Sequence, residues 1–408
     1  MSLMRLIKDY IPTSTKMDII RCKESLDRIL HGRKKITSSY TYKQFRNKGV
    51  HTFFGYYDIT PFNPVNNDIL YLEYTPSKKT AKIIRDNIEG GQRRVITSTN
   101  ACNWQQGCRL RWLPNDSSKV IFNDFVDGDY ISRIIDVNNG TEERLNMPLY
   151  DISPDGSIGI TLDFTRLGYM RPGYGYINLP FKEADESMLN EGVDIVDLGT
   201  KQIIKTVTYQ EMGLVMGKKP STVKNWYLNH LSFSPNGKKF LFFFLEKLSE
   251  TQFTASMMCY DIEKNQLKCL EPELKNSHYT WMNNDTILCT AYTFLKDRIK
   301  CGYYLYDTVT CERAEYCPQS LTIDGHPSRL NEEEIITDTY PDVISYQYIY
   351  KVNGVDDKKE TLIQVFNRTA DCAEQRTDLH PRLNRDHTLI CFDANIDSHR
   401  SMFVLKIK

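Results

Sequence analysis

Short apolar runs separated by turn residues recur along most of this chain. A typical stretch is 229-NHLSFSPNGKKFLFFFL-245, in which the turn SPNG joins two runs with strand-like patterning. Proline presets the backbone for such a turn, and Asn-Gly or Asp-Gly supplies the left-handed conformations that a hairpin needs. Seven stretches share this pattern, at residues 55–74, 104–124, 149–164, 229–245, 277–293, 325–342 and 378–393. The pattern therefore predicts a protein built from repeated hairpins.

A second pair of strand-like runs follows several of these stretches. Examples are residues 130–145, 257–270 and 303–316. Each unit then has four strands, which is the size of one propeller blade, and seven units predict an all-β, seven-bladed β-propeller. A pair of β-sandwiches is the competing all-β architecture, but it does not predict one unit repeated from residue 55 to residue 393.

The first residues differ from the repeats. Apolar positions at Ile19, Ile20, Leu26, Ile29 and Leu30, with Gly32 after them, predict a helix that packs on the propeller. We expect a helical extension over residues 1–38 and the propeller over residues 39–408. The alternating segment 40-YTYKQF-45 is expected to supply the outer strand of the last blade and so to close the ring.

Composition and charge exclude some classes of function. The chain has 408 residues, with 52 Lys plus Arg and 52 Asp plus Glu, so it lacks the overall positive charge of a general nucleic-acid binder. The longest apolar run, 240-FLFFFL-245, has the length of a strand and falls far short of the roughly 20 residues of a membrane span. We therefore expect neither a nucleic-acid partner nor a membrane span.

Cysteine usage bears on the compartment. The chain has eleven cysteines, an odd number, and no CxxC pair. This favours reduced thiols in the cytoplasm over a disulfide framework or a zinc knuckle.

Four histidines stand at the same position of four successive units, at the entry to the first strand. They are spaced by 48, 48 and 54 residues, at His230, His278, His326 and His380. In a propeller, equivalent positions of the innermost strands converge on one face around the central channel. One such histidine is more often a hydrogen-bonded residue at a strand end, but four in one register favour a divalent metal or an anionic ligand.

The last unit adds oxygen donors beside its histidine. Asp378 and His380 are two apart, so on an extended segment their side chains point to the same side. Gln375 lies shortly before them. Imidazole nitrogen with carboxylate and amide oxygen suits manganese, iron, cobalt, nickel or zinc better than calcium.

With these residues the chain resembles the oligogalacturonate lyases, which are cytoplasmic seven-bladed propellers that cleave uronic-acid oligosaccharides by β-elimination with a manganese-type ion. Their last blade reads Gln, two residues, then His-Pro-His-Pro, where this chain has Gln375, two residues, Asp378, Leu379, His380 and Pro381. The resemblance implies that Gln375, His380 and His278 are metal ligands and that His230 is the base. Asp378 replaces a family histidine, and its added negative charge would weaken the attraction of the site for a uronate carboxylate. Alternatively, His326 substitutes as the ligand.

The resemblance is specific in the last four units and only architectural in the first three. Ulvan lyases, propellers that act on another uronate-containing polymer, are a second resemblance. Both imply an acidic oligosaccharide or polysaccharide substrate and a divalent ion, manganese or else zinc.

The segment 164-FTRLGYMRPGYGY-176 is a candidate wall for that substrate. Arginine can hold a carboxylate with two hydrogen bonds, and tyrosine can stack on a sugar or protonate it. We expect Arg171 and Tyr174 to act in catalysis and Arg166 to bind the substrate; the alternative is a loop with its arginines in solvent. Further substrate contacts are expected from Tyr57, Trp104 and Gln105 on the same face, although packing is the more common role for such residues.

The sequence thus predicts a metal-dependent polysaccharide or oligosaccharide lyase. A propeller that binds a glycan or a protein without catalysis is the alternative from another class, and Asp378 at a ligand position is what a drifted lyase site would show. A metal-dependent glycan hydrolase is the third possibility. Unsaturated products would separate the lyase from both.

Overall fold

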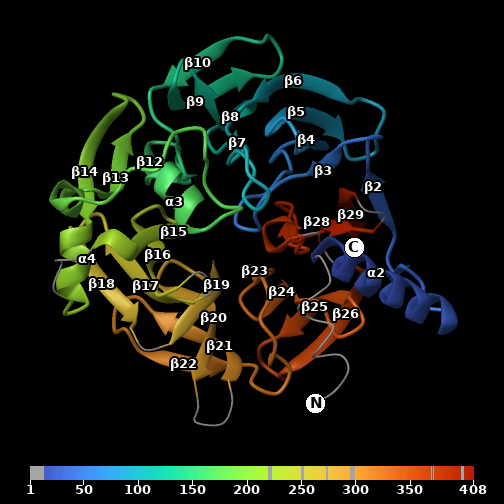
Figure 1. The fold of residues 1–408 in the computed structure, drawn as a ribbon. Coiled ribbons are helices and arrows are strands. Elements are labelled where there is room, and N and C mark those ends of the chain that lie inside the picture. Colours follow the sequence, from blue (N-terminus) through green and yellow to red (C-terminus); the bar gives the residue numbers. More distant parts are fainter. Residues whose placement is uncertain are drawn as a thin grey trace.

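The strands form a ring of small sheets around a central axis (Figure 1). The computed structural model describes residues 13–218, 223–249, 252–272, 274–294, 299–368, 370, 372–396 and 399–408. Within these residues there are seven antiparallel sheets, six with four strands and one with five. The predicted seven-bladed β-propeller is confirmed.

The first four blades follow one another along the chain, and each begins with its innermost strand. Blade 1 contains β3 (His51–Phe53), β4 (Asp68–Thr75), β5 (Thr80–Asn87) and β6 (Arg94–Thr99). Blade 2 contains β7 (Arg111–Leu113), β8 (Asp116–Val126), β9 (Asp129–Asp136) and β10 (Glu142–Leu145). Blade 3 contains β11 (Asp151–Ile152), β12 (Ile158–Thr161), β13 (Gly192–Asp197) and β14 (Gln202–Thr208). Blade 4 contains β15 (Trp226–Phe233), β16 (Lys239–Lys247), β17 (Phe253–Asp261) and β18 (Gln266–Glu271).

The last two blades each receive one strand from the beginning of the chain. Blade 5 contains β19 (Lys275–Trp281), β20 (Thr286–Phe294), β21 (Ile299–Asp307) and β22 (Arg313–Tyr316). Blade 6 contains β23 (Ser328–Arg329), β24 (Glu334–Asp338), β25 (Tyr346–Asn353), β26 (Lys358–Phe366) and, outermost, β1 (Ile36–Thr37). Blade 7 contains β27 (Arg382–Leu383), β28 (Leu389–Asn395), β29 (Arg400–Lys406) and, outermost, β2 (Tyr42–Phe45).

The ring is closed by β2, as the alternation of residues 40–45 predicts. Its four residues pair antiparallel with β29, from Tyr42 opposite Leu405 to Phe45 opposite Met402. Phe45 is buried, and its ring centroid lies 5.7 Å from that of Tyr71 in blade 1. The closing strand therefore joins the last blade to the first. The expected division of the chain at residue 38 stays a prediction, and β1 of the sixth blade precedes it.

Replacing Phe45 with alanine is expected to destabilise the ring by about 3–5 kcal/mol, because it leaves a cavity between the first and last blades. Gln44 is exposed on the same strand, and Gln44→Ala should cost no more than about 0.5 kcal/mol. Midpoints of chemical unfolding measure both. Equal midpoints for the two variants would contradict a closing role for the buried face of β2.

The predicted N-terminal helix is present as α2 (Thr13–Leu30), beside blade 6. Glu24 accepts a hydrogen bond from the Ser345 hydroxyl, and Arg28 lies over the Phe366 ring at 5.6 Å. Four of the five apolar side chains expected to pack on the propeller are exposed, namely Ile19, Leu26, Ile29 and Leu30. The fifth, that of Ile20, lies outside the described part of the structure. Polar and cation–π contacts therefore make the described part of this interface.

The other helices are short, and the first of them along the chain lies at the inner side of blade 3 (Figure 1). They are α3 (Phe164–Met170), η1 (Glu186–Asn190), α4 (Tyr209–Val215), η2 (Val223–Asn225) and η3 (Ala373–Gln375). Among the described helices, none combines the length and the apolar composition that a membrane crossing requires.

Candidate active site

The four predicted histidines converge, each within or just before the innermost strand of blades 4 to 7. His230 and His278 lie in β-bulges of β15 and β19, while His326 and His380 stand two residues before β23 and β27. Bulges re-aim side chains and are common beside active sites. His230 and His380 also have positive φ angles of 58° and 49°, a conformation that costs free energy in residues other than glycine and is concentrated at functional sites.

The four rings are buried and lie in a row. Ring centroids are 6.3 Å apart for His230 and His278, 3.9 Å for His278 and His326, and 4.3 Å for His326 and His380. Tyr56 lies against both ends of the row, 5.2 Å from His230 and 4.7 Å from His380. Its hydroxyl is buried without a hydrogen-bond partner among the described residues.

Three of the histidines are oriented through Nδ1. His326 Nδ1 lies 2.8 Å from Asp338 Oδ1, His278 Nδ1 lies 3.1 Å from Asp324 Oδ1, and His380 Nδ1 lies 3.2 Å from the Gly55 carbonyl oxygen. Carbonyl oxygens and carboxylates accept hydrogen bonds, so Nδ1 carries the proton in each ring. Nε2 is then left with a lone pair, which is the usual arrangement of metal-binding histidines.

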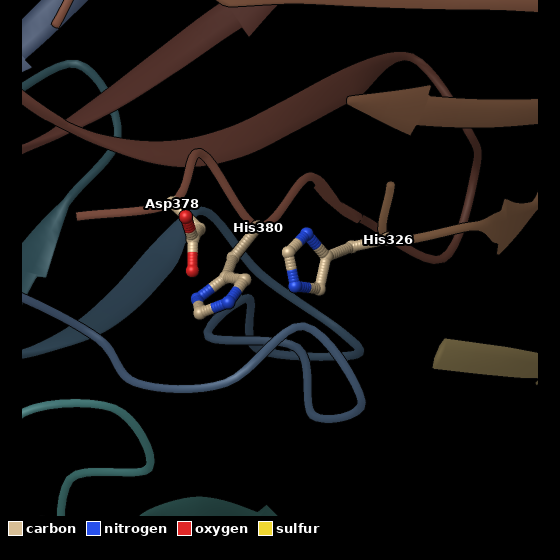
Figure 2. Close-up of side chains that lie close together, drawn as sticks. All are labelled: His326, Asp378 and His380. Atoms are coloured by element: carbon tan, nitrogen blue, oxygen red, sulfur yellow. The ribbon is translucent and has the colours of Figure 1, made fainter. Parts of the chain in front are cut away.

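His326 and His380 form a candidate metal site with Asp378. Figure 2 shows the His380 ring between the Asp378 carboxylate and the His326 ring. One ligand atom from each residue lies within 4.8 Å of the others. Nε2 of His326 and Nε2 of His380 are buried and have no hydrogen-bond partner in the described part of the chain. Two imidazole nitrogens and a carboxylate fit manganese, iron, cobalt, nickel or zinc.

Asp338 organises both histidines of this site. Its carboxylate accepts the Nδ1 proton of His326 and also the backbone N–H groups of His326, at 2.7 Å, and of His380, at 2.9 Å. It comes from the end of β24, far from His380 in sequence. One buried carboxylate therefore fixes the positions of two candidate ligands.

We expect Asp338→Asn to lower the affinity for Mn²⁺ by about 10–100-fold, because the amide keeps the shape but loses the charge and one acceptor. Titration calorimetry of metal-free protein measures the affinity. Asp386→Asn, on an exposed turn, is the matched control. Unchanged affinity in Asp338→Asn would contradict the role of Asp338 in positioning the two candidate ligands.

The negative charge of Asp378 is compensated locally. Nε of Arg376 donates to Oδ1 at 2.9 Å and Nη2 donates to Oδ2 at 2.7 Å. Burial acts to raise the pKa of Asp378, but the Arg376 guanidinium outweighs it and lowers the pKa below the usual value. The positive charge of Arg376 thus offsets the negative charge of Asp378, which was expected to weaken the attraction of the site for a uronate.

Burial sets the charge of the histidines. It lowers the pKa of His230 and His380 well below the usual value, and neighbouring positive groups lower it further, so both rings are neutral at neutral pH. Burial acts in the same direction on His326, but the Asp338 carboxylate outweighs it and raises the pKa of His326. Asp338 therefore favours positive charge at this position, from a proton or from a metal ion.

A cavity of about 320 Å³ opens beside the histidine row, and we call it the cationic cavity. Its wall includes His230, His278, Arg171, Tyr174 and Lys275. The structure thus brings together the three residues predicted to be catalytic, which are His230, Arg171 and Tyr174.

Two positive groups share one aromatic ring in this cavity. The Arg171 guanidinium carbon lies 4.5 Å from the centroid of Phe253, and Lys275 Nζ lies 3.8 Å from it. Burial, followed by the charge of Arg171, lowers the pKa of Lys275. An anionic ligand between the two would relieve this repulsion.

Other predicted site residues lie outside the cationic cavity. Arg166 is buried, and its guanidinium donates to the backbone carbonyls of Val223, Lys224 and Trp226 at 2.6–2.8 Å. These contacts fix α3 to the start of blade 4, so the expected contact with substrate is replaced by a structural one. Tyr57 packs against the histidine row, with its ring centroid 5.0 Å from that of His326, and it also lines a cavity at the opposite mouth of the channel. Its hydroxyl accepts a hydrogen bond from the Tyr279 backbone N–H.

Trp104 and Gln105 hold the segment before the metal site. Trp104 Nε1 and Gln105 Nε2 both donate to the Arg376 carbonyl oxygen, at 3.0 and 2.9 Å. Gln375 ends η3 and lines a different cavity, together with Trp104. Its role as a ligand stays a prediction, as does that of His278, which lies against His326 but outside the group of three.

Sequence reasoning missed Asp324, Asp338, Arg376 and Lys275. Asp324 stands two residues before His326, a spacing like that of Asp378 and His380, and this repeat could have drawn attention to it. Arg376 stands two residues before Asp378, so its contact is local in sequence. Asp338 and Lys275 become visible only when the blades are assembled.

Comparison with known proteins identifies the architecture. No family model and no curated protein matches the sequence. An oligogalacturonate lyase from Vibrio parahaemolyticus matches with a TM-score of 0.62 and 11% identity, over 91% of this chain and 98% of the lyase. This chain has the fold of that lyase. An oligogalacturonate lyase in complex with manganese matches with a TM-score of 0.60 and 12% identity, over 92% of this chain and 98% of that one.

Structural likeness to the oligogalacturonate lyases is thereby established, as the last-blade motif led us to expect. Propellers with other activities also match. The propeller domain of the Trilobed protease from Pyrococcus furiosus gives a TM-score of 0.50 and 10% identity, over 87% of this chain and 95% of the domain. At such identities the likeness concerns the fold, and the activity has to be argued from the site.

Proposed function

We propose that this protein is a metal-dependent lyase that cleaves a uronate-containing oligosaccharide or polysaccharide by β-elimination. The observation that carries the proposal is the position of the His326, Asp378 and His380 group beside a cavity that holds two cations and the neutral imidazole of His230. The cations suit a carboxylate, and the neutral imidazole is able to accept a proton.

His326, His380 and Asp378 would hold a divalent ion, with Gln375 and His278 as the further ligands that the lyase resemblance implies. Manganese is favoured over zinc because one of the similar structures is an oligogalacturonate lyase in complex with manganese. When bound, such an ion supplies Lewis-acid stabilisation of the negative charge that develops on the uronate carboxylate.

Three residues of the cationic cavity have separate roles in the proposed reaction. Arg171 holds the uronate carboxylate, and His230 takes the proton from C5. The electrons of the C5–H bond form the C4–C5 double bond, the C4–O4 bond breaks, and its electron pair leaves on O4. The Tyr174 hydroxyl then protonates O4. No oxidant, reductant or second substrate is needed, so the step balances.

The test is incubation of manganese-loaded protein with short oligouronates while the ultraviolet absorbance of the unsaturated uronate product is followed. We expect absorbance to rise together with new reducing ends. New reducing ends without absorbance would contradict the lyase and support a hydrolase. Saturable binding without any product would also contradict it and support the non-catalytic propeller.

A further inference from the structure

A second cavity lies on the other side of Tyr174 from the cationic cavity. It measures about 450 Å³, within the usual range of about 300–1,000 Å³ for small-molecule sites. Its wall includes Trp104, Tyr169, Asn178 and Gln375, and we call it the aromatic cavity. Among the described residues, Tyr174 alone lines both cavities. A ligand that spans Tyr174 would therefore occupy both.

Tyr174 is held rigidly between two glycines. A Cβ on Gly173 would lie 3.1 Å from the Glu374 side chain, and a Cβ on Gly175 would lie 2.4 Å from the Phe164 carbonyl oxygen. Both glycines have positive φ, which only glycine adopts without strain. The Gly175 carbonyl oxygen accepts a hydrogen bond from Asn103 Nδ2, and the Gly173 carbonyl oxygen accepts one from the Gln105 backbone N–H. The wall between the cavities is thus preorganised for binding.

The two cavities differ in charge. The cationic cavity has Arg171 and Lys275, and its one carboxylate, Asp324, is engaged by His278 and by three hydroxyl groups. The charged residues of the aromatic cavity are Lys79 and Glu374, which are exposed and of opposite sign.

The remaining groups of the aromatic cavity suit hydroxyl groups. The amide of Asn178 can both donate and accept hydrogen bonds, as sugar hydroxyls do, while aromatic rings such as Tyr169 offer an apolar face. A uronate placed there would lose hydration and would meet only one cation, the exposed Lys79, in a cavity that also has the negative charge of Glu374, which is unfavourable.

We propose that the aromatic cavity binds an uncharged sugar, so that the ligand of this protein alternates acidic and neutral sugars instead of carrying a carboxylate on every residue. The uncharged sugar is the one joined to O4 of the uronate in the cationic cavity. This extension rests on the proposed lyase reaction, because the bond broken in that reaction then lies over Tyr174 and the uncharged sugar leaves with O4.

The test is titration calorimetry of manganese-loaded protein with two tetrasaccharides of equal length, one a homo-uronate and one with uronate and neutral sugar in alternation. We expect the alternating ligand to bind at least about tenfold more tightly. Asn178→Lys adds a cation to the aromatic cavity and is expected to reverse this preference by favouring the homo-uronate. Gln319→Lys adds the same charge on an exposed surface outside both cavities and should leave the preference unchanged.

Equal or tighter binding of the homo-uronate by the unaltered protein would overturn the inference, and so would a preference that Asn178→Lys and Gln319→Lys change alike. These readouts need no turnover. If the alternating ligand is preferred but yields no unsaturated product, the lyase proposal fails and the assignment of the two cavities stands. If unsaturated products form from both ligands without preference in binding, the lyase proposal stands and the inference fails.

Discussion

His380→Ala is expected to remove the bound divalent ion and to abolish turnover. His380 supplies one of two buried Nε2 atoms that have no hydrogen-bond partner in the described residues, and alanine leaves His326 and Asp378 with too few ligands to hold the ion. Since loss of an outer-shell partner alone costs about 10–100-fold in metal affinity, loss of a ligand should cost more than about 100-fold. Elemental analysis and titration with Mn²⁺ measure this.

Two further variants make the His380→Ala result interpretable. His31→Ala removes an exposed imidazole far from the site in sequence and should retain the metal. His380→Gln keeps a polar side chain of similar length and guards against collapse of the fold; its unfolding midpoint should stay close to that of the unaltered protein while the metal is still lost. Full metal content in both His380 variants would contradict the assignment.

His230→Ala is expected to lower kcat by about 10²–10⁴-fold while the metal content and KM stay near their original values, because general-base catalysis by a positioned imidazole contributes about that much. His230 lines the cationic cavity, outside the group of His326, Asp378 and His380. Its loss should therefore separate turnover from metal binding.

The measurement is the rate of absorbance increase on an oligouronate, with metal analysis of the same samples. His230→Gln serves as the matched variant, since it fills the site and can hydrogen-bond but is a far weaker base. Full activity in either variant would show that another group takes the C5 proton. Loss of the metal in both would instead make His230 part of the metal site.

Much of the fold could be predicted because propeller blades are local structures. Each turn, such as 234-SPNG-237, joins neighbouring strands of one blade, so the repeat can be recognised from consecutive residues. The closing strand β2 could be predicted from its alternation together with the need to close a ring. The contact made by α2 could not, because periodicity fixes which residues share a helix face but does not fix what that face meets, and Leu26 and Ile29 are exposed.

The candidate site was predictable where it follows the repeat and unpredictable where it depends on contacts between blades. The four histidines share one register, so their spacing alone brings them together. Asp338 contacts His326 within blade 6 and reaches His380 through a hydrogen bond between blades 6 and 7, which no spacing encodes. Arg166 shows the opposite failure: its charge suggested a ligand contact, but backbone carbonyls at the start of blade 4 take its hydrogen bonds.

The central claim is that a divalent ion binds where the last two blades meet. The most direct test is anomalous diffraction at the manganese absorption edge from crystals grown with Mn²⁺. The account predicts an anomalous peak bonded to Nε2 of His326, Nε2 of His380 and the carboxylate of Asp378. A well-ordered site without that peak, or a manganese ion held by other residues, would contradict it.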